Sequence, residues 1–421
     1  MKKLITRLSL REFFCVVSVV FIAGCAQNAL KPVAEGDKIP AAIPVPVILV
    51  SIDGFKPDYL KRGVTPNLND LAATGVRAEA MRPSFPSITF PNHYALVTGL
   101  RPDRNGIVGN TMEDKTIPNV RFSLGNREAL NDRRWWDEAE PVWATAEKHG
   151  IRTATMFWPG SEAAIQGVRP TQWRRFDGKV SANDRVDTVL GWLEQPMSSR
   201  PAFLTLYFDE VDHAGHEYGP DMPQTTQAAA NVDAAIGRLR DGLTARNIKA
   251  NIVIVSDHGM AAMSRQRVIR LDQIVPGSGY RVITSGTYAG LEAKPGQENM
   301  LSAALLKPHD HMQCWRKEDI PARFHYGKNA RVPSFICLAE VGWQIAVNAK
   351  AAEKTSAGGH GYDNLAPEMQ AIFIAAGPSF KSGIVVAPFD NVDVYPLVMT
   401  LIGVKPLPSD GETTLFTTLS E

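Results

Sequence analysis

The chain has 421 residues, of which 44% are hydrophobic and 21% are charged, as is usual for globular proteins. Its 45 lysines and arginines nearly balance its 44 aspartates and glutamates, which leaves a net charge of +1. This composition excludes a disordered, collagen-like or coiled-coil chain. It also argues against a nucleic-acid polymer as partner, because such a partner requires a basic surface.

The first 24 residues have the pattern of a lipoprotein signal peptide. A basic start precedes an apolar run over residues 13–22, which is too short to span a membrane comfortably. The run ends in the sequence Ile-Ala-Gly-Cys, which resembles a bacterial lipobox and implies cleavage before Cys25 and lipidation of its thiol. The alternative is an ordinary signal peptide that is cleaved slightly later.

The residue after the cysteine is Ala26 rather than aspartate, which favours anchoring in the outer membrane. We therefore expect an exported lipoprotein that faces the periplasm or lies at the cell surface. Residues 25–43, rich in alanine and proline, are interpreted as a tether to a folded domain over residues 44–421.

Beyond the tether, apolar runs of strand length alternate with helical patterns. This alternation predicts an α/β/α sandwich with a mostly parallel central sheet. In chain order, we expect strands over residues 44–52, 153–158, 201–208, 251–256 and 371–376, and helices over residues 67–73, 225–246 and 392–401. Residues from about 262 to 355 contain more glycine, proline and charge, and we interpret them as an inserted α+β cap.

The chain has four cysteines. Cys15 is removed with the signal peptide and Cys25 is lipidated, which leaves Cys314 and Cys337 in an oxidising compartment. We therefore predict a disulfide between these two residues. The alternative is a pair of buried free thiols.

Carboxylates and imidazoles directly follow three of the expected strands. Asp53 follows the first, Asp212 and His216 follow the third, and Asp257 and His258 follow the fourth. Because the carboxyl ends of parallel strands lie along one edge of a sheet, we expect these side chains to gather there. A divalent cation would relieve the repulsion between the carboxylates, and a mixed Asp/His set favours zinc over calcium or magnesium.

Each of these residues has a plainer interpretation when it is taken alone. An aspartate after a strand is usually a helix cap or turn residue, and a single histidine is usually a satisfied polar group. The combination favours a metal site, and His360 adds to it, because the glycines around it allow the backbone to approach a ligand closely.

At these residues the chain resembles the nucleotide pyrophosphatase/phosphodiesterase family of the alkaline phosphatase superfamily, in its bacterial type. The similar segments occur in family order over roughly residues 44–415. They are VSIDGF (50–55), TPNLNDLAATGV (65–76), FPSITFPNHYALVTGLRPDRNGIVGN (85–110), WPGS (158–161), YFDEVDHAGHEYGP (207–220), VSDHGM (255–260), IPARFHY (320–326) and GGHGYDN (358–364).

The resemblance implies an alkaline phosphatase-like fold in which residues 44–421 are a catalytic domain that binds two Zn²⁺ ions. The residues that match the ligands are Asp53, Thr89, Asp257 and His258 for one ion, and Asp212, His216 and His360 for the other. His93 is interpreted as support for the segment that carries Thr89. His213 is adjacent to the ligands in sequence but points elsewhere by the motif, and we interpret it as a residue that supports them from behind.

The resemblance also assigns roles around the substrate. Thr89 matches the nucleophile, Asn110 the amide that binds a phosphate oxygen, and Phe90 the aromatic residue that stacks on a nucleobase. The implied activity is hydrolysis of phosphodiester or pyrophosphate bonds in small nucleotides, with release of nucleoside 5′-monophosphates through a covalent threonine intermediate. The residues alone would not have singled out Thr89, because a threonine in a loop is usually a turn or cap residue.

Other functions stay open at this point. One is a phosphodiesterase for lipid-derived choline phosphodiesters, and another is a phosphate monoesterase. The absence of lysine and arginine from residues 85–100 argues against the monoesterase, whose substrate carries more charge. A lipoprotein that only binds a ligand is disfavoured by the intact set of matching residues. The sequence indicates no oligomeric state.

Overall fold

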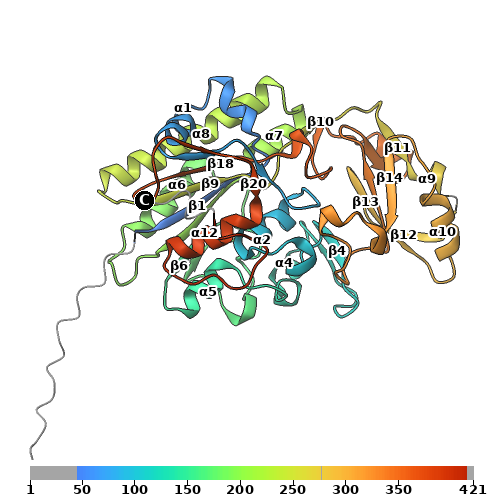
Figure 1. Cartoon of the computed structure of the whole chain (residues 1–421), viewed down its shortest axis with the longest axis horizontal. Coiled ribbons are helices and arrows are strands. Elements are labelled where there is room, and N and C mark those ends of the chain that lie inside the picture. The colour runs from blue at the N-terminus through green and yellow to red at the C-terminus, as the bar shows by residue number, and fades with distance from the viewer. Residues whose placement is uncertain (1–44, 276, 415–421) are drawn as a thin grey trace, which may run out of the picture. The chain divides into compact units, whose positions relative to one another are not determined.

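An eight-stranded sheet lies at the centre of the computed structural model, which describes residues 45–275 and 277–414 (Figure 1). In spatial order its strands are β19 (Ile384–Val386), β2 (Val76–Ala78), β18 (Phe373–Ala376), β9 (Asn251–Val255), β1 (Val47–Ile52), β8 (Phe203–Phe208), β6 (Thr153–Met156) and β7 (Gln172–Trp173). Neighbouring strands are parallel except around β18, which runs antiparallel to both β9 and β2. The mostly parallel sheet that the sequence predicts is therefore confirmed.

Helices cover both faces of this sheet because its central strands are apolar on both sides. Along β1, Val47 and Leu49 join one buried core, whereas Ile48 and Val50 join the other. The helices that contribute to the first core are α2 (Thr89–Thr98), α5 (Val142–Lys148) and α12 (Val394–Leu401). Those that contribute to the second are α1 (Pro66–Thr74), α6 (Ala182–Leu193), α7 (Glu210–Tyr218) and α8 (Pro223–Ala245).

The expected elements correspond to observed ones, with differences at their ends. The five expected strands are β1, β6, β8, β9 and β18, and each is shorter than its apolar run. The strands that the sequence did not indicate, β2, β7 and β19, have only two or three residues. The last expected helix starts later, at Val394, because residues 391–393 form a 3₁₀ turn.

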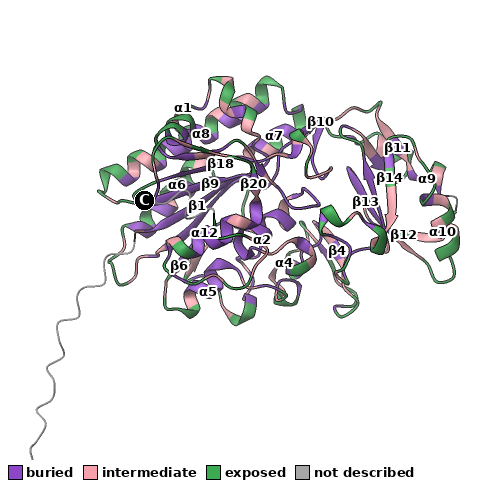
Figure 2. Cartoon of the chain, in the orientation of Figure 1, coloured by how far each residue is buried: buried purple, intermediate pink, exposed green. Residues whose placement is uncertain are grey.

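A second sheet lies between residues 280 and 339. Its four antiparallel strands, in spatial order, are β12 (Tyr280–Thr284), β13 (Tyr288–Ala293), β15 (Phe335–Ala339) and β14 (Met312–Arg316). Its buried face packs with α9 (Leu271–Ile274) and α10 (Glu298–Leu305) in a separate core (Figure 2). Cys314 and Cys337 are paired opposite each other in this sheet and form a disulfide.

Short elements complete the fold. The paired strands are β10 (Ala261–Ala262) with β17 (Gly358–Gly359), β11 (Val268–Arg270) with β16 (Gln344–Ala346), β3 (Met81–Arg82) with β20 (Phe389–Asp390), and β4 (Thr111–Glu113) with β5 (Arg121–Ser123). The short helices are α3 (Pro102–Asn105), α4 (Arg127–Asn131) and α11 (Ala349–Ala352). The β10–β17 pair brings His360, which directly follows β17, back to the central sheet.

The expected signal peptide over residues 1–24, the lipidation site Cys25 and the tether over residues 25–43 lie outside the described residues. Within residues 45–275 and 277–414, no helix has both the length and the apolar composition needed to span a bilayer.

Candidate active site

The residues that match the family's ligands come together at the carboxyl edge of the central sheet. Asp53 follows β1, and Asp257 with His258 follows β9, the neighbour of β1 on one side. On the other side of β1, strand β8 leads into α7, which carries Asp212 and His216 one turn apart on the same helical face. Parallel pairing of these three strands therefore gathers side chains that are about 200 residues apart in the sequence.

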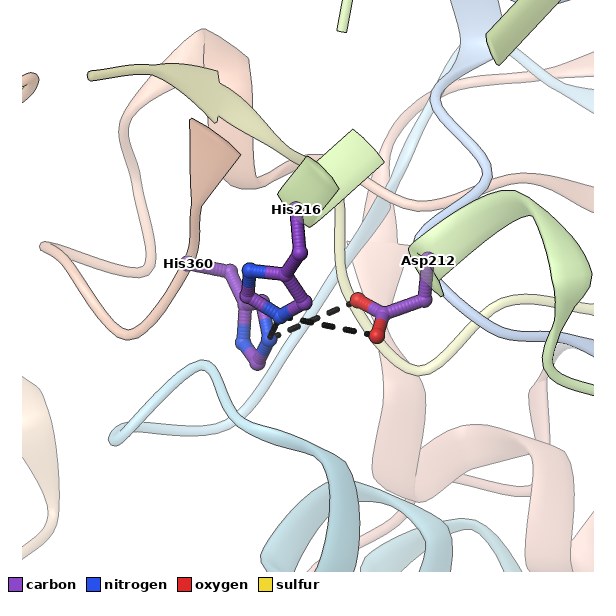
Figure 3. Close-up of side chains that lie close together, drawn as sticks. All are labelled: Asp212, His216 and His360. Carbon is purple, nitrogen blue, oxygen red and sulfur yellow. Dashed lines mark hydrogen bonds and ion pairs between the residues drawn. The ribbon is translucent and has the colours of Figure 1, made fainter. Parts of the chain in front are cut away.

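Asp212, His216 and His360 form one group (Figure 3). The Nε2 atoms of His216 and His360 are 3.0 Å apart. The Asp212 carboxylate lies 3.5 Å from each of them, with Oδ2 nearer His216 and Oδ1 nearer His360. Each residue thus directs one potential ligand atom into the same small space.

The hydrogen bonds of the two imidazoles fix which nitrogen carries the proton. Nδ1 of His216 lies 2.9 Å from the Gly358 carbonyl oxygen, and Nδ1 of His360 lies 3.1 Å from that of Ser87. A carbonyl oxygen can only accept, so both Nδ1 atoms donate, and in the neutral rings both Nε2 atoms present lone pairs to each other. A proton on one Nε2 or a cation between the rings would relieve the repulsion between these lone pairs, and the nearby carboxylate of Asp212 suits a cation.

Asp53, Asp257, His258 and Thr89 form a second group next to the first. Nε2 of His258 lies 3.0 Å from Asp257 Oδ2, 3.5 Å from Asp53 Oδ1 and 3.4 Å from Thr89 Oγ1. Nδ1 of His258 again faces a backbone carbonyl, that of Gly259, at 2.9 Å. The hydroxyl of Thr89, the first residue of α2, therefore points into a cluster of carboxylate and imidazole ligands.

Each of the three carboxylates has one buried oxygen without a hydrogen-bond donor among the described residues, although the side chain of Asp212 is 18% exposed. Asp53 Oδ1, Asp212 Oδ1 and Asp257 Oδ2 have no hydrogen-bond partner within the described part of the chain. Leaving a buried charged oxygen unpaired is costly, and metal coordination removes that cost. The donor set and its unpartnered atoms therefore fit divalent cations.

Burial and neighbouring charges shift the pKa values of the residues in this cluster. Burial raises the pKa of Asp53 well above its usual range, and the carboxylates of Asp257 and Asp212 add to the rise. Burial also raises the pKa of Asp212. For Asp257 the effect of burial is outweighed by His258 and His93, which hold its pKa well below the usual value. Burial and the neighbouring imidazoles lower the pKa of His360, so this ring stays neutral and able to bind a metal.

His93 is fully buried beneath the second group, and its contacts suit a support. Its Nε2 lies 2.8 Å from the Ser51 hydroxyl, and its Nδ1 lies 2.9 Å from the Thr89 carbonyl oxygen. The same Nδ1 is 3.3 Å from Asp257 Oδ2. With both ring nitrogens engaged, His93 connects the start of α2 to the carboxylate of Asp257.

His213 points away from the ligands, as the motif indicates. Its side chain is 80% exposed and lies 3.7 Å from Glu217 on the same helix. The supporting role expected for it is wrong, because α7 turns this residue toward solvent while Asp212 and His216 face the site.

Asn110 and Phe90 lie beside Thr89. The side-chain oxygen of Asn110 accepts a hydrogen bond from the Phe90 backbone N–H at 2.9 Å, which fixes the amide and orients its NH₂ group. Phe90 lines a mostly apolar pocket of about 220 Å³ that also includes Thr89, Asp53 and Asp212. The other aromatic and aliphatic residues in its wall are Leu124, Leu130, Phe157, Trp158, Phe176 and Tyr207.

Two residues at the rim of this pocket were not indicated by sequence reasoning. Phe176 is 42% exposed and Leu124 is 51% exposed, although both are large and apolar. Each lies in an irregular segment with no periodic sequence pattern. Their common position in the pocket wall is therefore seen only in the folded structure. Exposed apolar side chains beside a cluster of potential metal ligands indicate a binding surface for a flat apolar group.

Comparison with known families gives a consistent result. The model of the family described as type I phosphodiesterase / nucleotide pyrophosphatase matches residues 47–363. An uncharacterized pyrophosphatase/phosphodiesterase of Schizosaccharomyces pombe is 36% identical over 96% of this chain and 84% of its own length. Ectonucleotide pyrophosphatase/phosphodiesterase family member 3 of Bos taurus is 38% identical over 92% of this chain. The match covers 45% of that bovine relative, so this chain spans less than half of its length.

Solved structures show the same likeness. Murine ectonucleotide pyrophosphatase/phosphodiesterase 5 has a TM-score of 0.85 and 34% identity, over 89% of this chain and 100% of that chain. One structure of the murine protein is of an inactive variant, with a threonine replaced by alanine, in complex with AMP.

Proposed function

The chain belongs to the type I phosphodiesterase / nucleotide pyrophosphatase family, and we propose that it hydrolyses phosphodiester and pyrophosphate bonds of small nucleotides to release nucleoside 5′-monophosphates. The observation that carries the proposal is the position of the Thr89 hydroxyl. Thr89 lines the apolar pocket, and its hydroxyl oxygen lies 3.4 Å from Nε2 of His258. The same nitrogen contacts the carboxylates of Asp53 and Asp257.

We infer that the cofactor is a pair of Zn²⁺ ions. Asp53, Thr89, Asp257 and His258, which match the family's ligands and meet at the His258 ring, would hold one ion. Asp212, His216 and His360, whose ligand atoms converge, would hold the other. Such ions, when bound, lower the pKa of a hydroxyl and neutralise charge on phosphoryl oxygens. The mixed nitrogen and oxygen ligands favour zinc over magnesium or calcium.

Thr89 acts as the nucleophile in this proposal. Its Oγ1 releases a proton to solvent and bonds to phosphorus, while the leaving group departs from the opposite side with the electron pair of the broken P–O bond. The nucleoside monophosphate is then held as a threonine phosphodiester. Water attacks the same phosphorus, its hydroxyl stays on the released nucleoside 5′-monophosphate, and its proton passes to Thr89 Oγ1. The site at the N-terminus of α2 favours the phosphoryl group, since the helix dipole is positive there.

Asn110 and the apolar pocket bind the parts of the substrate that do not react. The Asn110 NH₂ group donates to a non-bridging phosphoryl oxygen, where charge increases in the transition state. The pocket behind Phe90 accepts the nucleobase, for which aromatic stacking contributes about 1–3 kcal/mol with little dependence on base identity. The complex of an inactive variant of the murine relative with AMP supports a nucleoside 5′-monophosphate as a ligand of this chain.

A panel of three chromogenic substrates tests the proposed function. We expect the zinc-loaded protein to turn over p-nitrophenyl thymidine 5′-monophosphate much faster than p-nitrophenyl phosphate or p-nitrophenylphosphorylcholine. EDTA should abolish the activity, and zinc should restore it. Preference for the choline ester would instead assign the protein to lipid-derived diesters, and preference for the monoester would make it a phosphatase.

We further propose that the protein is exported and anchored to the membrane through lipid on Cys25. The basis is the lipobox-like end of the apolar run, and the disulfide between Cys314 and Cys337 suits an oxidising compartment. In a Gram-negative host, the wild-type protein should incorporate radiolabelled palmitate and fractionate with membranes. A Cys25→Ala variant that is labelled and retained to the same extent would contradict this localisation.

A further inference from the structure

A second cavity, of about 320 Å³, adjoins the His216 and His360 side of the ligand cluster. It is distinct from the apolar pocket, since the two share no lining residue. The central domain contributes Ile88, Asn110 and both histidines to its wall. The segment from residue 263 to 359 contributes the remaining lining residues, which are mostly polar.

The two cavities differ in charge and polarity. The apolar pocket is lined by aromatic rings and by the carboxylates of Asp53, Asp212 and Glu162. The second cavity is lined by hydroxyl and amide side chains and by Lys354, and no carboxylate lies among its lining residues. A lining that combines the ammonium of Lys354 with several hydroxyl groups suits an anion with several oxygens, such as a phosphate.

The ligand cluster links the two cavities. Thr89 lies in the apolar pocket, and the ring of His258 beside it stacks on that of His360 with 3.6 Å between ring centroids. His360 and His216 in turn line the second cavity. A phosphoryl group at the cluster therefore has the nucleophile on one side and the second cavity on the other, and in-line displacement expels the leaving group away from the nucleophile.

From this arrangement we propose that the second cavity binds the leaving group and selects leaving groups that carry their own phosphate, with Lys354 as the specificity-determining residue. The inference rests on the proposed function and names the substrate class within it. Nucleoside di- and triphosphates and dinucleoside polyphosphates leave as phosphate-bearing anions, and Lys354 attracts these. The glycerol or choline released from a choline phosphodiester carries no phosphate, so Lys354 gives such a leaving group no attraction.

A comparison of kcat/KM on two substrates tests this inference. Wild type, Lys354→Ala and Lys354→Glu are compared on ATP, whose leaving group is pyrophosphate, and on p-nitrophenyl thymidine 5′-monophosphate, whose leaving group carries no phosphate. Loss of one charged contact should lower the ratio of kcat/KM for ATP to that for the ester about tenfold in Lys354→Ala, mainly through KM, and further in Lys354→Glu. Lys350→Ala, an exposed lysine that does not line the cavity, should keep the wild-type ratio.

A binding measurement separates recognition from catalysis. In a zinc-loaded Thr89→Ala background, α,β-methylene-ATP should bind more tightly than AMP, and adding Lys354→Ala should remove about tenfold of that advantage while AMP affinity stays the same. An unchanged preference in both assays, or an equal loss for both ligands, overturns the inference and leaves the proposed function standing. A wild-type protein that is folded and zinc-loaded but hydrolyses neither substrate overturns both.

Discussion

Replacing Gly54 with alanine should weaken metal binding through a specific steric contact. Gly54 directly follows Asp53 and adopts a left-handed backbone conformation, with φ of +69°. A Cβ atom at this position would lie 3.1 Å from Cα, Cβ and Oδ1 of Asp212. Relief of these contacts displaces the carboxylate that approaches both His216 and His360.

The expected effect has two parts. An alanine in the left-handed region costs about 1–2 kcal/mol of folding stability. Displacement of Asp212 by a few tenths of an ångström should weaken metal affinity about 10–100-fold, as is usual when the orientation of a metal ligand is disturbed. Since each tenfold change corresponds to about 1.4 kcal/mol, the loss of metal affinity is about 1.4–2.8 kcal/mol and is similar in size to the loss of folding stability.

Gly63→Ala is the matched control. Gly63 has φ of +76°, yet a Cβ atom there would meet nothing within 4 Å. Both variants should lose similar stability in urea unfolding of the metal-free protein, and only Gly54→Ala should lose zinc affinity in competition with a chelator. Equal zinc affinity in the two variants would refute the reasoning, because the contact with Asp212 would then have no consequence.

Three further predictions concern the hydrogen bond to Asp53 in the site, the pH dependence of folding stability, and the disulfide in the second sheet. Tyr207→Phe removes the 2.6 Å hydrogen bond that the Tyr207 hydroxyl donates to Asp53 and that lowers the pKa of this carboxyl. Zinc affinity should therefore fall about tenfold at pH 7 and recover at higher pH. Competition with a chelator measures this affinity, and an unchanged pH profile would contradict the prediction. Burial raises the pKa of Asp393 to about 6, so the folded protein favours the protonated form of this carboxyl. The stability that this preference gives is fully present below about pH 4 and is lost as the pH rises through 6. Asp393→Asn keeps an acceptor for the Glu412 N–H and should be about 1 kcal/mol more stable than wild type at pH 7.5, after allowance for solvent screening. Urea unfolding at pH 7.5 and 4.5 checks this. A difference in the free energy of unfolding between variant and wild type that is equal at both pH values counts against it. The disulfide between Cys314 and Cys337 spans a sequence separation of 23, and replacing both residues with alanine should lower the free energy of unfolding by about 3 kcal/mol. Urea unfolding of the oxidised wild type and the double variant measures this, and equal midpoints would contradict it.

The parts of the site that follow strands could be predicted from the sequence. Strands β1, β8 and β9 are apolar on both faces, which identifies them as central and parallel, and parallel strands end at a common edge. This topology is enough to bring Asp53, Asp212 and Asp257 together. Thr89 came only from the family resemblance, because it lies at the start of a helix with no flanking strand or pattern that marks it.

The parts that could not be predicted depend on contacts between irregular segments. Phe176 and Leu124 reach the apolar pocket from two separate loops, and loop conformations leave no periodic signal. Lys354 lines the second cavity because β17 pairs with β10, a contact between strands of two residues each. The supporting role expected for His213 failed for a related reason, since a residue next to a ligand in sequence lies on another face of α7 and does not contact that ligand.

The most direct test of the central claim is peptide mapping of the enzyme quenched with acid during turnover of ATP. We predict adenosine monophosphate attached to the peptide that contains Thr89, and no adduct in a Thr89→Ala variant that still binds zinc. Turnover near the wild-type rate by that zinc-loaded variant, or an adduct on another residue, would contradict the assignment of Thr89 as the nucleophile.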